Sequence, residues 1–143
     1  MSEKNLESKI SYLQMIQSSI DRMSTTSAIF KGFSATIITG ISAVSFTEIN
    51  KWVLFLAVLP IVCFLALDVY YLQLEKRYRI LYNEVISGRH KIDFNLAPPK
   101  IETTWDMLST IWKSLKSPSI YLFYGPTIII AGIIVIMKFA GGI

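Results

Sequence analysis

The stretch from residue 63 to residue 82, CFLALDVYYLQLEKRYRILY, begins as an apolar run and ends in a cluster of basic and aromatic residues. Its first half has the composition of a membrane span, and its second half that of a segment at a cytoplasmic membrane surface. Asp68 lies inside the apolar half, directly after the tripeptide LAL. The stretch therefore predicts a spanning helix that continues beyond the membrane and carries one carboxylate at membrane depth.

The composition of the whole chain is that of a membrane protein. Its 143 residues are 52% hydrophobic and 17% charged, with a mean hydropathy of +0.49. One small water-soluble core does not need so much apolar surface. The length allows a few spans in one compact unit and excludes a large catalytic domain. Cys63 is the single cysteine, so an intrachain disulfide is excluded.

Three stretches approach the length of about 20 residues that a helix needs to cross a bilayer. They are residues 30–46, 53–72 and 120–137, and the hexapeptide TEINKW joins the first two in a tight hairpin. Residues 43–45 resemble a signal-peptide cleavage site, but the long region before the first span mixes acidic and basic residues, unlike a short basic leader. The sequence therefore predicts an all-α integral membrane protein with three transmembrane helices.

Lysine and arginine are concentrated in two segments, and this asymmetry predicts the orientation. Residues 1–31 and 75–118 contain all of them except Lys51 in the hairpin and Lys138 near the C-terminus. Because positively charged loops stay in the cytoplasm, we expect the N-terminus and residues 75–118 inside and the C-terminus outside.

Four segments are expected along the chain. Residues 1–26 form a cytoplasmic amphipathic helix that leads into the first span, because apolar residues recur there at steps of three and four. Residues 27–73 form a transmembrane hairpin. Residues 74–118 form a cytoplasmic helical segment that Gly88 interrupts and that passes through a linker with Pro98 and Pro99. It ends in a short amphipathic helix that lies either in the membrane interface or against the protein. Residues 119–143 form the third span and an external tail.

Lys31 and Asp68 are expected at the same membrane depth. If the hairpin turns near residues 48 and 49, both lie nearly the same number of residues from the turn. A lone charge at membrane depth costs at least ~2.5 kcal/mol, and pairing with an opposite charge recovers part of this cost. The sequence thus predicts an intramembrane ion pair. In the alternative, each side chain reaches the headgroup region separately, Lys31 along its own aliphatic stem.

Hydroxyl side chains form a stripe along the first predicted span. At 100° per residue they fall on about a quarter of the helix surface, together with Lys31 and interrupted by one isoleucine. Polar groups avoid lipid, so the stripe either packs against other helices or lines a pore formed by several copies of the chain. The candidate pore-lining residues are Ser27, Ser34, Ile38, Ser42 and Ser45. On a neighbouring face, Gly32, Thr36 and Gly40 follow a small-xxx-small pattern that favours close helix packing.

Basic and aromatic residues gather just after the second span. Anionic lipid headgroups are the simplest partner for such a juxtamembrane cluster. A nucleotide or short single-stranded oligonucleotide is the alternative, because cations bind phosphates and aromatic rings stack on bases. The candidate binding residues are Lys76, Arg77, Tyr78, Arg79, Tyr82, Arg89 and Lys91.

The sequence contains no motif of a known catalytic chemistry. Phosphate-binding glycine loops, HExxH, GxSxG and cysteine–histidine clusters are all missing. We expect neither an enzyme nor a bound metal or cofactor, and we expect His90 to be an ordinary loop residue.

Several of these segments together resemble a known family. SYLQMIQSSIDRMSTTS at residues 11–27, KGFSATIITGISA at 31–43, LALDVYYLQLEKRYRILYNEV at 65–85 and IDFNL at 92–96 are similar to small bacterial inner-membrane proteins of the RipA-type octameric family. The resemblance covers about residues 11–96. It implies a homo-oligomer in the bacterial cytoplasmic membrane and brings no enzymatic activity with it. By architecture alone, the chain is also similar to anti-phage membrane effectors whose pores are gated by the nucleotide or oligonucleotide product of a partner enzyme.

Two functions are consistent with these features. The first is a homo-oligomeric channel or membrane-disrupting effector that senses a ligand or a cytoplasmic partner enzyme through its basic cluster. The second is a non-conducting oligomeric scaffold that recruits a cytoplasmic partner.

Overall fold

The computed structural model of the chain describes residues 3–48, 50–99 and 104–141, with only the backbone described for residues 104–107. The described residues form four helices and no strand: α1 (Glu3–Val44), α2 (Lys51–Ile86), α3 (Thr104–Leu115) and α4 (Pro118–Phe139). Three of them, α1, α2 and α4, are long and apolar enough to cross a membrane. The structure confirms the all-α class, and the three predicted spans lie in the three helices that are long and apolar enough to cross a membrane.

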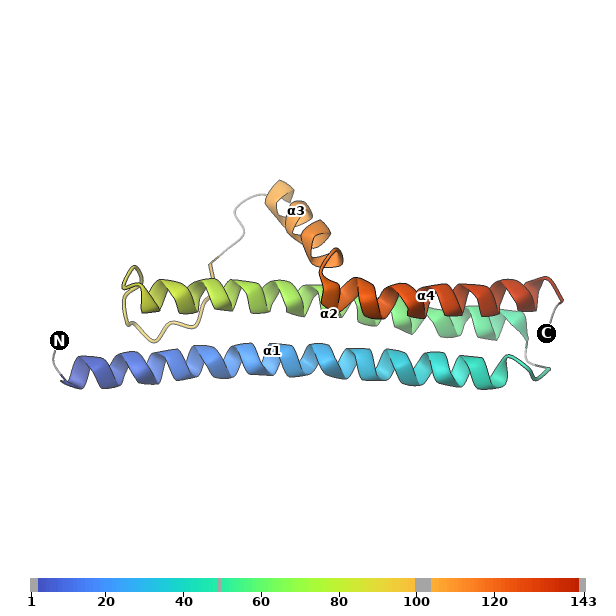
Figure 1. Cartoon of the computed structure of the whole chain (residues 1–143), viewed down its shortest axis with the longest axis horizontal. Coiled ribbons are helices and arrows are strands. Elements are labelled where there is room, and N and C mark those ends of the chain that lie inside the picture. Colours follow the sequence, from blue (N-terminus) through green and yellow to red (C-terminus); the bar gives the residue numbers. More distant parts are fainter. Residues whose placement is uncertain (1–2, 49, 100–103, 142–143) are drawn as a thin grey trace.

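The helices α1 and α2 form a long antiparallel hairpin (Figure 1). At 1.5 Å per residue, the 42 residues of α1 extend about 63 Å and the 36 residues of α2 about 54 Å, roughly twice the thickness of a hydrocarbon core. Both helices therefore continue well beyond any membrane that they cross. The expected boundary between residues 26 and 27 falls inside α1, which is one continuous helix.

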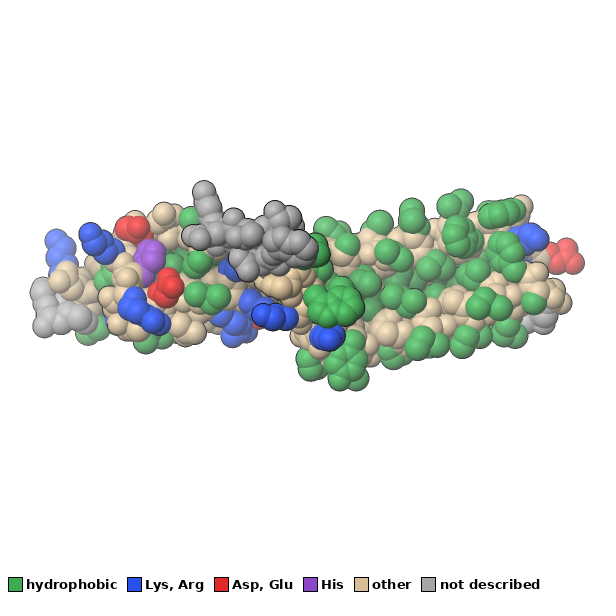
Figure 2. Space-filling model, turned by 90° about the horizontal axis from the view of Figure 1, so that it is seen from above, with side chains coloured by type: hydrophobic (Ala, Val, Ile, Leu, Met, Phe, Trp, Pro, Cys, Tyr) green, Lys and Arg blue, Asp and Glu red, His purple; other side chains and the backbone are tan. Residues whose placement is uncertain are grey.

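The two ends of the hairpin differ in character. We call residues 27–72 with α4 the apolar half, and residues 3–26 with 73–99 the charged half. Figure 2 shows hydrophobic side chains covering the apolar half, whereas basic, acidic and histidine side chains gather on the charged half. This division is the one expected of a protein whose apolar half lies in lipid and whose charged half lies in water.

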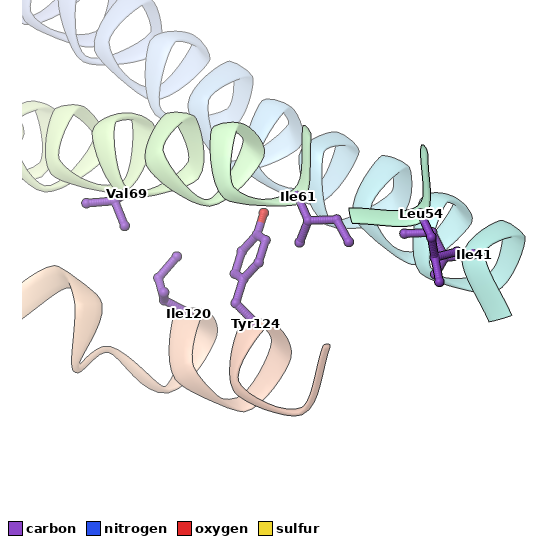
Figure 3. Packing of buried hydrophobic residues seen from close by; sticks show 6 residues of the cluster. All are labelled: Ile41, Leu54, Ile61, Val69, Ile120 and Tyr124. Atoms are coloured by element: carbon purple, nitrogen blue, oxygen red, sulfur yellow. The ribbon is translucent and has the colours of Figure 1, made fainter. Parts of the chain in front are cut away.

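Each half has its own hydrophobic core. In the apolar half, residues from three helices pack together: Ile41, Leu54, Ile61, Val69, Ile120 and Tyr124 (Figure 3). In the charged half, α1 and α2 pack through Tyr12, Ile16, Ile20, Leu81 and Val85. Of the apolar stripe predicted for the N-terminal helix, Ile16 and Ile20 belong to this core and Leu13 packs against it, whereas Leu6 is exposed. The partner of the stripe is the extension of α2.

The helix α4 packs beside the hairpin and runs antiparallel to α2 (Figure 1). It begins at Pro118 with Ser117 as its N-cap, although the Ser117 side chain makes no capping hydrogen bond. At its other end, Lys138 Nζ donates to the carbonyl oxygens of Ser45 at 3.1 Å and Thr47 at 2.7 Å. These contacts satisfy carbonyl groups left free where α1 ends.

A segment that we call the strap, residues 87–99, follows α2 and lies along the charged half. Helix α2 ends at Ile86, and Gly88 adopts φ +72°, a left-handed conformation that favours glycine. The strap is fixed to both helices. Tyr12 Oη donates to the carbonyl of Asn95 at 2.5 Å, and Arg77 Nε donates to the carbonyl of Pro99 at 2.7 Å. The predicted linker is thus non-helical and packed against the helices.

The short helix α3 projects from the bundle where the two halves meet (Figure 1). It contacts both α2 and α4. Its Leu108 and Trp112 side chains are exposed, whereas Ile111 and Leu115 pack against the core of the apolar half. One side of α3 therefore covers protein and the other presents apolar groups to its surroundings.

Candidate functional site

A buried polar cluster joins α1 and α2 near the boundary of the two halves. Asp68 is completely buried, and its Oδ2 lies 2.5 Å from Lys31 Nζ. The other carboxylate oxygen, Oδ1, accepts a hydrogen bond from Ser27 Oγ. Lys31 also donates to Ser27 Oγ at 2.8 Å, since the two residues lie one turn apart on α1. The carboxylate thus has a cation and a hydroxyl donor on the facing helix.

The physical reason for this arrangement is the cost of an unpaired carboxylate in an apolar environment. The Asp68 side chain is too short to reach water, whereas the Lys31 side chain retains 18% of its exposure. The longer Lys31 side chain therefore extends to the buried Asp68 carboxylate. A pair with this geometry fixes the register and the relative rotation of α1 and α2, because a shift of one residue would separate the two charges.

Two further hydroxyls lie beside the pair without a hydrogen-bond partner. Ser34 Oγ on α1 and Tyr124 Oη on α4 are both fully buried and unpartnered among the described residues. Tyr124 points from α4 toward α2 (Figure 3). Its hydroxyl lies near Ser34 and Asp68. Residues from all three long helices therefore converge on Asp68.

The remaining residues of the serine stripe also turn toward the interior of the chain. Ser45 is buried, and Ile38 and Ser42 are half-buried. Ser42 Oγ donates to the Ile38 carbonyl and Ser45 Oγ to the Ser42 carbonyl, each at 2.8 Å. In the single chain these residues lie at contacts between helices. That they line a pore stays a prediction, because a pore needs several copies of the chain.

The small-residue face of α1 points away from the other helices. Gly32, Thr36 and Gly40 are all exposed, and a Cβ added at either glycine would meet no atom within 4 Å. Thr36 Oγ1 donates to the Gly32 carbonyl at 3.0 Å, so its hydroxyl is satisfied within the helix. This face can contact lipid or another helix without leaving the Thr36 hydroxyl unpaired.

The seven predicted binding residues are not brought together in one pocket. Tyr78 and Tyr82 pack against the core of the charged half. Arg77 binds the strap, and Arg79 forms an exposed ion pair with Glu75 at 2.8 Å. The other three, Lys76, Arg89 and Lys91, are exposed. Lys76 faces α3, whereas Arg89 and Lys91 lie on the strap.

Sequence reasoning missed two residues that organise these contacts. No sequence pattern distinguished Tyr124, because tyrosines are common near the ends of membrane spans. Tyr12 had no predicted role within the N-terminal amphipathic helix, yet it binds the strap. Its ring also contacts Phe94 and His90, at centroid distances of 5.6 and 6.3 Å.

Burial and the nearby carboxylate of Asp93 both raise the pKa of Tyr12.

Within the described residues, no group of three or more histidine, cysteine, aspartate or glutamate side chains is placed to hold a metal ion. The chain matches no known family model, no curated protein and no solved structure.

Proposed function

We propose that this chain forms a homo-oligomeric channel or membrane-disrupting effector in a bacterial cytoplasmic membrane, assembled through the outer face of α1. The observation that supports this proposal is the exposed face with Gly32, Thr36 and Gly40, which has no partner within the described chain. The resemblance to an octameric family points the same way.

Self-association through this face follows from the physics of helices in lipid. Lipid tails are as apolar as leucine, so helix association depends on close packing and not on the hydrophobic effect. Glycine and threonine at four-residue spacing allow two backbones to approach closely. The large side chains of the apolar half, such as Leu56 and Leu59 on α2, are exposed and suit contact with acyl chains. A second copy of α1 is therefore the partner that this face fits best.

A conduit in such an assembly has two candidate linings. One is the predicted serine stripe, which must then turn away from α2 and α4 on opening. The other is the exposed α1 surface beside the face with Gly32, Thr36 and Gly40. It carries Thr39, whose hydroxyl bonds to the carbonyl of Ala35 at 2.8 Å. In either case the charged half lies in the cytoplasm and senses a nucleotide, an oligonucleotide or a partner enzyme.

A non-conducting scaffold is the second candidate function, and the position of the serines favours it. Ser27, Ser34 and Ser45 are buried inside the single chain. If the chain keeps this packing in the assembly, these hydroxyls stabilise the contacts between helices and do not line a conduit. The oligomer then presents its charged halves to a cytoplasmic partner.

Leucine substitutions on α1 test the assembly. We expect Gly32→Leu with Gly40→Leu to reduce the particle mass to that of one chain, since leucine side chains keep the backbones apart. Gly132→Leu on α4 is the matched control, because an added Cβ there also meets no atom within 4 Å. Mass photometry and crosslinking in native membranes measure the outcome. An unchanged particle mass in the α1 variant would exclude assembly through the face with Gly32 and Gly40.

Ion flux from liposomes separates the two functions. We expect the reconstituted protein to release a trapped dye or ions, and the Gly32→Leu, Gly40→Leu variant to release none. A serine-lined conduit is blocked by Ser42→Leu, and one lined by the α1 surface at Thr39 is blocked by Thr39→Leu. The oligomer should stay intact in both variants, because neither residue belongs to the face with Gly32, Thr36 and Gly40. No flux from a correctly assembled oligomer, with or without candidate nucleotides, supports the scaffold.

A further inference from the structure

A groove runs between α2 and α3 at the boundary of the two halves. Its volume is about 400 Å³, and it extends along α2 from Val62 to Gln73, with Ile111 and Leu115 of α3 on its other side. Eleven residue steps at 1.5 Å give it a length of about 16 Å. Apart from Tyr70 and Gln73, its lining side chains are aliphatic.

The groove is apolar at one end and polar at the other. Val62 lies deep in the apolar half, whereas Gln73 and Tyr70 lie where the charged half begins. Figure 2 shows lysine and arginine side chains at this boundary, next to the hydrophobic surface. A ligand that follows the groove therefore needs an apolar chain about as long as the groove and a polar or charged group at its end.

Lys76 places a positive charge at the polar end of the groove, and two further lysines lie on or next to α3. Lys76 lies one turn beyond Gln73 on α2, and its Nζ is 3.5 Å from Ser114 Oγ on α3. Lys116 Nζ lies over the exposed ring of Trp112, 5.2 Å from its centroid. Lys113 is exposed on the same helix. Within the part of the chain that the structure describes, none of these three lysines forms an ion pair.

We propose that this groove binds an anionic phospholipid. One acyl chain lies along Val62, Ala66 and Val69, and the headgroup phosphate contacts Lys76. The apolar lining and its length fit one acyl chain, and the unpaired lysines fit a negative headgroup at the depth where α3 leaves the bundle. Trp112 is an aromatic residue of the kind that settles at the membrane interface.

The lipid would join α3 to the bundle. The described residues of α3 contact α2 along one side, through Ile111, Leu115 and Ser114, whose Oγ lies 3.5 Å from Lys76 Nζ. An acyl chain between the two helices extends this contact, and the phosphate binds Lys76 at the point where Lys76 meets Ser114. Lipid occupancy thereby controls the position of α3 relative to α2. This inference is independent of oligomerisation, because the groove lies within one chain.

Native mass spectrometry of the delipidated full-length protein tests the proposal. The probes are phosphatidylglycerol and phosphatidylcholine with identical acyl chains, titrated separately and counted per protomer. We expect one phosphatidylglycerol to bind at least tenfold more tightly than phosphatidylcholine. Lys76→Gln should weaken phosphatidylglycerol binding about fivefold, as expected for the loss of one lysine near a headgroup. It should weaken phosphatidylcholine binding less, because the choline cation offsets the charge of the phosphate.

Two controls separate the groove from ordinary lipid around the protein. Ala66→Phe fills the groove and should weaken binding of both lipids, whereas Leu59→Phe, at an exposed position of the same helix, should not. Arg79→Gln removes a basic residue already paired with Glu75 and should have little effect. Glycerol phosphate, which has the headgroup but no acyl chain, should not compete. Equal affinity for the two lipids, equal effects of Ala66→Phe and Leu59→Phe, or full competition by glycerol phosphate would each overturn the proposal.

Discussion

At the scale of single residues, Asp68 carries the strongest constraint on this molecule. It is fully buried, and its two carboxylate oxygens bind Lys31 and Ser27 on the facing helix. A carboxylate cannot be left unpaired in an apolar core, because its desolvation costs several kcal/mol. Any packing of α1 on α2 must therefore bring Lys31 and Ser27 to it. One charge thus fixes the fit of two long helices.

Alanine substitutions of Lys31 and Asp68 should lower the stability of the protein by different amounts. We expect Lys31→Ala to lower the free energy of unfolding by about 3–5 kcal/mol, because it leaves a buried carboxylate unpaired. Asp68→Ala should cost less, since the Lys31 side chain is 18% exposed and can extend toward the surface. The double substitution should be less damaging than Lys31→Ala alone.

Unfolding of the detergent-solubilised protein, followed by circular dichroism, measures these differences. The exposed Arg79–Glu75 pair provides the control, and its loss should change stability by no more than about 1 kcal/mol. Equal effects of Lys31→Ala and Arg79→Ala would show that the buried pair does not stabilise the hairpin.

At the scale of elements, the strap ties the end of α2 back to the start of α1. Tyr12 is the central contact: it bonds to Asn95 and packs against Phe94, which has φ +56°. Asn95 and Ala97 donate their backbone N–H groups to the side chains of Asp93 and Asn95, at 2.9 and 3.0 Å. These local turns shape the strap, and Tyr12 fixes it to the helices.

The pKa of Tyr12 predicts how this contact responds to alkali. Burial and the Asp93 carboxylate raise that pKa above its ordinary value of 10.0, so the folded state holds the proton more tightly than the unfolded state. The contact is fully stable below pH 10, and its contribution is lost as the pH rises through the folded pKa. Tyr12→Phe should lose about 0.5–1.5 kcal/mol of stability at pH 8 through the missing hydrogen bond to Asn95.

Unfolding curves between pH 8 and pH 11 test this expectation for the wild-type protein and Tyr12→Phe. The difference between the two should shrink above about pH 10, because only the wild type has the tyrosine proton to lose. Tyr121→Phe, at an exposed tyrosine of α4, controls for the loss of a hydroxyl in general. A difference that stays constant across the range would exclude the titration of Tyr12 as its cause.

At the scale of the whole molecule, the division into an apolar and a charged half organises every proposed interaction. The apolar half suits contact with lipid. We propose a second copy of the chain at the small-residue face of α1 and anionic headgroups at the boundary near Lys76. The distribution of lysine and arginine along the sequence further predicts that the charged half lies in the cytoplasm.

Labelling of single cysteines tests this orientation. In a Cys63→Ser background, Glu48→Cys lies near the hairpin turn and Lys91→Cys lies on the strap, and both positions are exposed. A membrane-impermeant maleimide should label Glu48→Cys in intact spheroplasts and label Lys91→Cys only after lysis. The opposite pattern would reverse the orientation and move the lysine cluster to the outer surface.

The sequence alone determined the class of the protein, because apolar runs of about 20 residues and the helical periodicity of the N-terminal segment are local properties. It also predicted that Lys31 and Asp68 lie at the same depth, since a short hairpin relates depth directly to residue number. The approach of Tyr124 to that pair, the inward turn of the serines and the groove between α2 and α3 depend on how α3 and α4 pack against the hairpin. Only the tertiary structure decided them, because the rotation of one helix against another is set by side chains far apart in the sequence.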